Sequence, residues 1–175
     1  MTYKSKKRLV QVYTGNGKGK TTAAIGLAIR AAGAGYKVYI QQFIKGRIYS
    51  ELKALSKIKN IKAEQCGRGC FIKGKPTMLD KICAQSGLLR AEQIIMSGKY
   101  DLVILDEVNV ALKLGLIECE KVIDIISRKP KDVEIVLTGR YCPSCILECA
   151  DLVTEMREIK HPYKKGIPAR RGIEY

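Results

Sequence analysis

Aromatic side chains and long apolar runs are scarce in this sequence of 175 residues. It contains no tryptophan, two phenylalanines and one histidine, and aromatic residues make up 6% of the chain. No apolar stretch approaches the roughly 20 residues of a membrane-spanning helix, and the basic segment 1–8 lacks the apolar core of a secretion signal. These absences argue against a membrane or exported protein, and we expect a cytoplasmic one.

Acidic residues are also few, with 17 aspartates and glutamates against 32 lysines and arginines and a net charge of +15. Such a charge favours a polyanionic partner. The basic residues are nevertheless spread along the chain, with concentrations at 4–8 and 160–171, and the sparse aromatics form no RNA-binding signature. Because the same charge would suit a nucleotide, an acidic partner or solubility alone, we do not expect nucleic-acid binding.

The seven cysteines occur in a chain without a secretion signal. An odd number cannot form a complete set of intramolecular disulfides, so we expect reduced thiols. Cys142, Cys145 and Cys149 have the spacing of metal ligands, and with Cys66 and Cys70 they could form a zinc or iron–sulfur site. We favour unligated thiols, because Cys145 and Cys149 lie one helical turn apart and suit a protein core.

A glycine-rich segment is the most informative feature present. Residues 14–22 read T-G-N-G-K-G-K-T-T, after the apolar run 9–13 and before the helix-like run 23–34. The glycines let the backbone turn tightly with its N–H groups inward, and the helix adds the positive end of its dipole. Thr14 replaces the first glycine of the general pattern, but both required flanks are present. We predict a phosphate-binding loop rather than a surface turn, with the nucleotide bound by Gly15, Gly17, Lys18, Gly19, Lys20, Thr21 and Thr22.

Two residues of this loop have side chains suited to a nucleoside triphosphate such as ATP. Lys20 would supply a point charge for the outer phosphates. The hydroxyl of Thr21 can ligate a magnesium ion that bridges them. The sequence thus predicts a site for a metal–nucleotide complex.

Strand-like and helix-like segments alternate along the whole chain, without repeats or an obvious linker. This alternation is typical of an α/β fold with a mainly parallel central sheet flanked by helices on both faces, and 1–175 fits one domain. Apolar periodicity and turn residues predict strands at 9–13, 37–43, 61–65 (an edge strand), 102–105, 133–137 and 152–156, helices at 23–34, 51–57 and 78–97, and a loop at 66–76.

Charged residues follow two of the buried strands. Asp106 and Glu107 come directly after 102–105 as a Walker-B-like pair, and Arg140 follows 133–137. The carboxyl ends of parallel strands meet at one edge of a sheet, so the two carboxylates would lie beside the phosphate loop and its metal. Arg140 would point towards the same site and hold phosphate oxygens, unless it is a surface arginine.

Segments along nearly the whole chain resemble the ATP:cob(I)alamin (corrinoid) adenosyltransferases, the P-loop family that acts in cobalamin synthesis and salvage. Together, in this order and spacing, they are specific to that family rather than to phosphate-loop proteins in general. The matching segments are V-Y-T-G-N-G-K-G-K-T-T-A-A (12–24), Q-F-I-K-G (42–46), Y-D-L-V-I-L-D-E (100–107), L-T-G-R (137–140), A-D-L-V-T-E-M (150–156), K-H-P-Y-K-K-G (160–166) and A-R-R-G-I-E-Y (169–175).

The resemblance implies a RecA-like P-loop fold, a homodimer, and transfer of the 5′-deoxyadenosyl group of ATP to the cobalt(I) of a reduced corrinoid. Tripolyphosphate would leave, and Mg²⁺ or Mn²⁺ would assist. Cobalt(I) is the nucleophile, so the protein mainly supplies positioning and charge stabilisation. An electron-donating flavoprotein or another reductase would supply the reduced corrinoid.

The resemblance also assigns residues to roles. It implies catalytic roles for Lys20, Glu107 and Arg140, a metal site of Thr21, Glu107 and Asp106, and a nucleotide contact from Asn16. Phe71 matches the aromatic on the corrinoid face, where it would displace the lower axial ligand, although a core packing role is an equal alternative. For His161 we expect a packing or hydrogen-bonding role rather than cobalt ligation.

Two departures from the family bear on the substrate. Only about eight residues precede the first strand, whereas some members carry an N-terminal helical extension over the active site. Ile72, Lys73 and Gly74 follow Phe71, without the second aromatic of some relatives. Two other functions stay open: a phosphate-loop ATPase acting on nucleic acid or a protein partner, and a non-catalytic corrinoid carrier.

Overall fold

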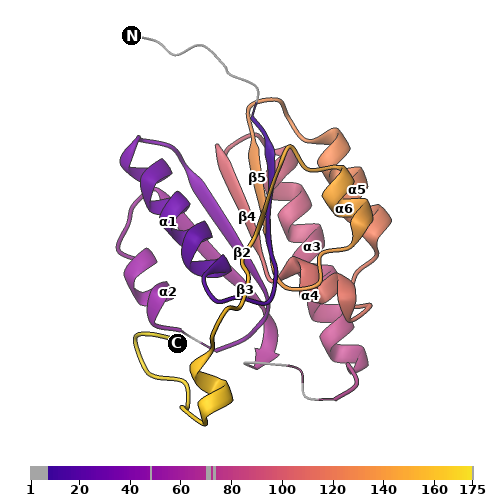
Figure 1. Ribbon diagram of the computed structural model, residues 1–175. Helices are drawn as coiled ribbons and strands as arrows, with labels where there is room; N and C mark the ends of the chain where they lie inside the picture. The colour runs from indigo at the N-terminus through magenta and orange to yellow at the C-terminus, as the bar shows by residue number, and fades with distance from the viewer. Residues whose placement is uncertain (1–7, 48, 70–71, 73, 175) are drawn as a thin grey trace.

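Six parallel strands form one sheet in the computed structural model, which describes residues 8–47, 49–69, 72 and 74–174 (Figure 1). The strand order is β3-β2-β4-β5-β1-β6, so that β5 lies between β1 and β4. The strands are β1 (Val10–Thr14), β2 (Val38–Lys45), β3 (Ile61–Gly69), β4 (Leu102–Asp106), β5 (Glu134–Thr138) and β6 (Leu152–Glu155).

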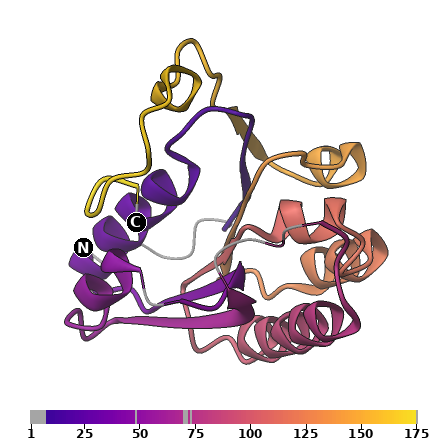
Figure 2. The same cartoon turned by 90° about the horizontal axis from the view of Figure 1, so that it is seen from below.

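Helices cover both faces of the sheet, as Figures 1 and 2 show. The helices α1 and α2 lie on one face and α3 to α6 on the other. Their bounds are α1 (Lys20–Gly33), α2 (Ser50–Leu55), α3 (Met78–Met96), α4 (Val108–Lys113), α5 (Cys119–Arg128) and α6 (Ser144–Glu148), followed by a 3₁₀ helix, η1 (Pro162–Lys165). The predicted α/β class, with a parallel sheet between helices, is confirmed.

Alternation along the strands divides the core in two. Because successive strand residues point to opposite faces, Val103 and Leu105 of β4 join the cluster under α3 and α5, while Leu102 and Ile104 join the cluster under α1. Every residue of β4 is buried. This explains why the central strands read as continuous apolar runs: each is covered on both sides.

Small residues bring α1 close to the sheet. Its buried apolar positions, Ala24, Ala28 and Ala31, recur at helical spacing and form one narrow face. The short side chains let the helix axis approach the strands, and the first turn of α1 is thereby fixed at the end of β1. The phosphate-loop segment between these elements is held at both ends.

The edge strand β3 is longer than the sequence indicated. An edge strand was predicted at 61–65 and a loop from Cys66 onwards, but pairing with β2 continues to Gly69. A bulge at Ile44, where φ is 67°, shifts the register, and Lys45 pairs with Gly69 beyond it. The loop prediction was therefore wrong for 66–69, because ladder hydrogen bonds to a neighbouring strand override the local effect of two glycines.

The first apolar residues of α3 face outward. Helical spacing predicted this helix correctly, but among its apolar residues only those from Ala84 onwards, such as Leu88 and Ile95, are buried on the sheet. Four others are between 49% and 72% exposed: Met78, Leu79, Ile82 and Leu89. Periodicity thus located the helix without showing that it is apolar on two faces.

A disulfide joins α5 to α6. Cys119, the first residue of α5, is bonded to Cys145 of α6, with the two Cα atoms 7.5 Å apart. The expectation of reduced thiols is wrong for this pair, because the chain order gave no sign that α6 packs on the start of α5. Cys142 and Cys149 carry free thiols, and all four pack against the core. Within the described residues, no three histidine, cysteine or acidic side chains are grouped to hold a metal ion.

Among the described helices, none combines the length and the apolar character needed to cross a membrane.

Candidate nucleotide-binding site

The glycine-rich segment between β1 and α1 lies at the carboxyl end of the sheet, against the chain that follows β6. Gly15 (φ 94°) and Gly19 (φ 119°) adopt left-handed conformations that favour glycine. A Cβ atom on Gly17 would lie 2.7 Å from the carbonyl oxygen of Met156, and its N–H donates to that same oxygen at 2.6 Å. Only glycine fits this close approach, so the spacing of the glycines reflects the packing of the loop as well as its turns.

Lys20 begins α1 and is almost completely buried. Its ammonium group donates to the carbonyl oxygens of Gly15 (2.7 Å) and Gly17 (2.6 Å) and so lies inside the loop. Burial and the neighbouring charge of Arg140 lower its pKa, against the opposing effects of Glu107 and Asp106. The loop therefore encloses a cation at the position where a phosphate group would be bound.

Asp106, at the end of β4, is the most heavily hydrogen-bonded side chain of the site. Its Oδ1 accepts from the hydroxyls of Thr21 (2.8 Å) and Thr138 (2.7 Å). Its Oδ2 accepts from the amide of Gln42 (3.2 Å) and pairs with the ammonium of Lys45 (2.9 Å). These donors come from α1, β5 and β2, so one buried carboxylate joins three neighbouring elements.

Lys45, just beyond the bulge of β2, is the closest positive charge to Asp106. Burial acts to lower its pKa, but the charge of Asp106 and its hydrogen bond, with a smaller contribution from Glu107, raise the pKa above its ordinary value. The ammonium group also lies 5.5 Å from the ring centroid of Tyr49. A fixed cation thus stands beside the predicted metal ligands.

Glu107 turns the chain sharply from β4 into α4. Its backbone is left-handed (φ 61°), and its N–H donates to the hydroxyl of Thr138 at 3.1 Å. Burial and the adjacent charge of Asp106 raise the pKa of its carboxyl group, although Lys45 and Lys20 act in the opposite direction. Within the described part of the chain this carboxylate has no hydrogen bond or ion pair, so it is available to a cation.

Arg140 follows β5 and is exposed at the same edge of the sheet. Its charge contributes to the lowered pKa of Lys20 and acts against the raised pKa of Glu107, so it lies near both groups. Its guanidinium makes no hydrogen bond or ion pair with another described residue. The structure therefore brings together Lys20, Glu107 and Arg140, which span 120 positions of the chain.

The C-terminal segment closes one side of the phosphate loop. A cavity of about 520 Å³ lies between Gly17 and Lys18 on one side and residues 157–174 on the other. Lys18 pairs with Glu174 at 2.9 Å, across 156 residues of sequence. Nδ1 of His161 accepts from the N–H of Tyr163 at 3.2 Å and caps η1, which is the hydrogen-bonding role expected of it. Figure 1 shows this segment (yellow) beneath the sheet.

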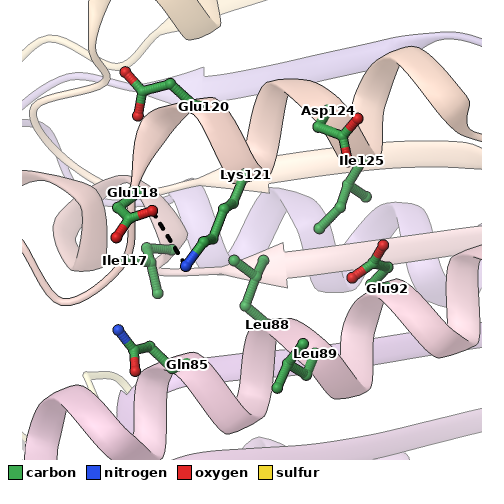
Figure 3. A pocket seen from close by; sticks show the side chains of 10 residues that line it. All are labelled: Gln85, Leu88, Leu89, Glu92, Ile117, Glu118, Glu120, Lys121, Asp124 and Ile125. Atoms are coloured by element: carbon green, nitrogen blue, oxygen red, sulfur yellow. Dashed lines mark ion pairs between the residues drawn. The ribbon is translucent and has the colours of Figure 1, made fainter.

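A second cavity, of about 490 Å³, lies in the groove between α3 and α5 (Figure 3). Leu88, Leu89, Ile117 and Ile125 give it an apolar lining. Its rim is mostly acidic, and Lys121 pairs there with Glu118 at 3.1 Å. None of the residues predicted to bind nucleotide lines this groove, so it is separate from the site at the sheet edge.

Comparison with known proteins decides which phosphate-loop family this site belongs to. The model of the family described as ATP:corrinoid adenosyltransferase BtuR/CobO/CobP matches residues 6–175. The chain belongs to this family. Its enzymes transfer the adenosyl group of ATP to a corrinoid, and that activity is the one expected of this chain.

Curated members of the adenosyltransferase family match most of the chain. The corrinoid adenosyltransferase of Pseudomonas aeruginosa is 36% identical over 166 residues, which cover 94% of this chain and 82% of that protein. That of Escherichia coli K12 is 34% identical over 167 residues (95% and 85%), and CobA of Salmonella typhimurium is 32% identical over 167 residues (95% and 85%). The predicted family is confirmed.

A solved structure of an ATPase from a bacterial type III secretion system is also similar. It is 16% identical with a TM-score of 0.40, over 91% of this chain and 48% of that one. This similarity is too low to support a conclusion about function.

Most of the side chains that meet at this edge of the sheet were predicted from the sequence, but not all. The structure brings Lys20, Thr21, Asp106 and Glu107 together with Arg140, as their positions at strand ends predicted. Phe71 lies outside the described residues. Three further side chains at Asp106 were not singled out, although each lies within or next to a family segment at a strand end: Gln42, Lys45 and Thr138.

The oxygen donors of the site fit a hard divalent cation. Thr21, Asp106 and Glu107 supply one hydroxyl and two carboxylates, the ligand types that Mg²⁺ prefers. Glu107 in particular is a half-buried carboxylate whose pKa is raised by desolvation and by the adjacent charge of Asp106. A cation beside it would remove that cost.

Proposed function

We propose that this protein transfers the 5′-deoxyadenosyl group of ATP to the cobalt(I) centre of a reduced corrinoid and releases tripolyphosphate. The cobalt electron pair forms the bond to C5′ of the ribose, and the C5′–O bond breaks with its electrons remaining on the triphosphate. The observation that carries the proposal is the convergence of Lys20, Glu107 and Arg140 on the phosphate loop in a chain of this family.

The protein's part in this reaction is to bind and stabilise the leaving triphosphate. The loop amides and Lys20 would hold its phosphate oxygens, and Arg140 would add a second cation as negative charge develops. Lys20 would then exchange its bonds with the loop carbonyls for bonds to phosphate. Because the attack falls on carbon rather than phosphorus, no base is needed to activate water.

Asn16 and the other residues of the loop complete the proposed nucleotide contacts. With Gly15 and Gly19 they would present backbone N–H groups to the triphosphate, and Lys18 and Thr22 would contribute at the edges. Gly17 belongs to the same loop, but its own N–H donates to Met156. Thr21, Asp106 and Glu107 would hold Mg²⁺ or Mn²⁺, which when bound neutralises charge on the triphosphate. Asp106 is already fully hydrogen-bonded, so Glu107 is the carboxylate more open to direct coordination.

The corrinoid side of the site is proposed from the family alone. Phe71 would lie against the corrinoid face and favour loss of the lower axial ligand, which makes cobalt(II) easier to reduce. An electron-donating flavoprotein or another reductase would deliver the electron. We also propose that the protein forms a homodimer.

An anaerobic assay tests the transferase against the ATPase alternative. The protein is mixed with ATP, Mg²⁺ and chemically reduced cob(I)alamin, the visible spectrum is followed, and the phosphate product is identified. We expect loss of the cobalt(I) absorbance, a light-sensitive adenosylated product, and tripolyphosphate formed only when corrinoid is present. Orthophosphate released without corrinoid chemistry would instead identify an ATPase.

A further inference from the structure

Asn109, the second residue of α4, is a fully buried amide beside the catalytic edge of the sheet. Its Nδ2 donates to the carbonyl oxygen of Gly139 at 3.2 Å. Its Oδ1 has no hydrogen-bond partner among the described residues. Asn109 therefore connects the turn that carries Glu107, two residues before it, to the residue directly before Arg140.

The loop that Asn109 contacts is tightly constrained. Gly139 has a φ of 130°, and a Cβ atom at that position would lie 3.0 Å from the Cβ of Asn109. On the other side of Arg140, Tyr141 is also left-handed (φ 62°). Arg140 thus stands between two unusual backbone conformations, which persist only where the surroundings hold them.

Two hydrogen bonds tie this loop to the turn after β4. The N–H of Glu107 donates to the hydroxyl of Thr138, and Asn109 donates to Gly139. The first bond fixes the end of β5, and the second fixes the residue from which Arg140 departs. Of these two bonds, only that of Asn109 acts on the loop itself. The loop is also held from β1, since the N–H of Gly139 donates to the carbonyl oxygen of Tyr13 and the N–H of Cys142 to the hydroxyl of Thr14.

The unpaired Oδ1 costs stability at this position, whereas the bond to Gly139 satisfies a carbonyl oxygen. A buried polar group that leaves one of its atoms unpaired is less favourable than an apolar side chain of similar shape. Leucine has the same branched shape with larger end groups, so it would remove the unpaired Oδ1 but also leave the Gly139 carbonyl oxygen without this donor. The amide must therefore be explained by its bond to Gly139.

We propose that Asn109 is a positioning residue that holds the Gly139 carbonyl so that Arg140 is directed towards the triphosphate of ATP. This inference rests on the function proposed above for Arg140. Asn109 itself would touch neither ATP nor corrinoid. Without its donor, the loop would relax and the guanidinium would lose its fixed direction.

A double-mutant cycle separates this role from a purely structural one. It compares the wild type, Asn109→Leu, Arg140→Ala and the double variant in the rate of adenosyl transfer, in the Kd for ATP and in Tm. We expect Asn109→Leu to lower kcat at least tenfold and to raise the Kd at least threefold. These losses should not scale with the fall in Tm caused by the larger side chain and the unpaired Gly139 carbonyl. In the Arg140→Ala background, the same change should produce no further loss in either quantity.

Asn109→Asp provides a second variant of unchanged shape, in which an oxygen replaces the donor that faces Gly139. We expect it to lose activity as Asn109→Leu does. Ile125→Val, a substitution in the core under α5, is the matched control, which should lower Tm slightly and leave kcat unchanged. A kcat of Asn109→Leu within twofold of wild type, losses that multiply in the double variant, or losses that track Tm would each overturn the proposal.

The double-mutant cycle in the Kd for ATP separates the proposed function from the positioning role of Asn109. A wild-type protein that transfers no adenosyl group would refute the proposed function, whatever the variants do. Coupling between Asn109 and Arg140 in the Kd for ATP would still support the positioning role in that case. Independent effects on the Kd would contradict the positioning role even in an active transferase.

Discussion

Two buried charges at the site are balanced before any nucleotide is bound. The ammonium of Lys20 is held by loop carbonyls, and the carboxylate of Asp106 by four donors. Buried charges are tolerated only when they are paired or hydrogen-bonded. Glu107 is the exception, since its carboxylate lacks such partners among the described residues. These differences lead to two predictions for single residues.

Replacing Lys20 with alanine should lower kcat for adenosyl transfer at least tenfold, roughly the lower end of the effect of losing one charged contact to a transition state. The same change should weaken ATP binding, because the loop loses its only buried cation. Initial rates of adenosylcobalamin formation measure the effect. Lys99→Ala, an exposed lysine before β4, is the control and should act like wild type. Near-normal turnover of Lys20→Ala would refute the phosphate-loop assignment.

Replacing Glu107 with glutamine should stabilise the nucleotide-free protein at neutral pH. The pKa of Glu107 is higher in the folded state than its ordinary value of 4.5. At a pH above 4.5 the unfolded chain therefore ionises more readily than the folded protein, which lowers the free energy of unfolding. That cost is absent below pH 4.5 and grows as the pH rises towards the folded-state pKa. We therefore expect a higher Tm for Glu107→Gln at pH 7, with a difference that shrinks as the pH falls to 4.5. An equal or lower Tm at pH 7 would contradict the assigned burial of this charge.

At the scale of elements, strand ends rather than strand interiors carry the site. Ends of β1, β2, β4 and β5 supply the phosphate loop, Lys45, Asp106 and Thr138, because parallel strands bring their carboxyl ends to one edge. The helices contribute differently. The start of α1 supplies Lys20 and Thr21, whereas α5 and α6 pack on each other and supply none of these side chains.

The disulfide between α5 and α6 should contribute to stability. Cys119 and Cys145 are 26 residues apart, and closing a loop of that size is expected to add about 3.5 kcal/mol to the free energy of unfolding. We expect the free energy of unfolding to fall by this amount on reduction with dithiothreitol, or in Cys119→Ser. Urea unfolding of protein purified in air measures the change. Cys83→Ser removes a free thiol and is the control. The pairing would be contradicted if the urea concentration at the midpoint of unfolding did not change on reduction. It would also be contradicted if mass spectrometry found no peptide cross-linked through Cys119 and Cys145.

At the scale of the whole molecule, the C-terminal segment lies across the phosphate loop without joining the core. No described residue from 157 onwards is buried, yet Gly17 packs on the chain at Met156 and Lys18 pairs with Glu174. The segment is thus attached to the site more than to the fold. It forms one wall of the cavity beside the loop.

A chain that ends at Ile159 should therefore fold but bind ATP poorly. Because none of the described residues in the removed segment is buried, we expect the free energy of unfolding to change by no more than about 1 kcal/mol. The Kd for ATP, measured by calorimetry, should rise at least tenfold. Glu174→Gln, which removes only an exposed ion pair, is the control and should change the Kd less than about fivefold. Wild-type affinity in the shortened protein would show that this wall does not contact the nucleotide.

The sequence by itself determined the phosphate loop, the α/β class, the family and most of the strands. These features depend on local patterns, in which glycine spacing, apolar runs and the charges after them are read within a few residues. Asp106, Glu107 and Arg140 were predictable because the rule for parallel strand ends converts chain order into position.

Only the tertiary structure decided which distant groups meet. Asp106 takes one hydrogen bond from a residue 85 positions away and another from one 61 positions away, and no local pattern encodes such pairs. The same holds for the disulfide, for the added length of β3 and for the bond from Asn109 to Gly139. These contacts depend on how strands are ordered and helices packed, because long-range packing and pairing energies outweigh local preference.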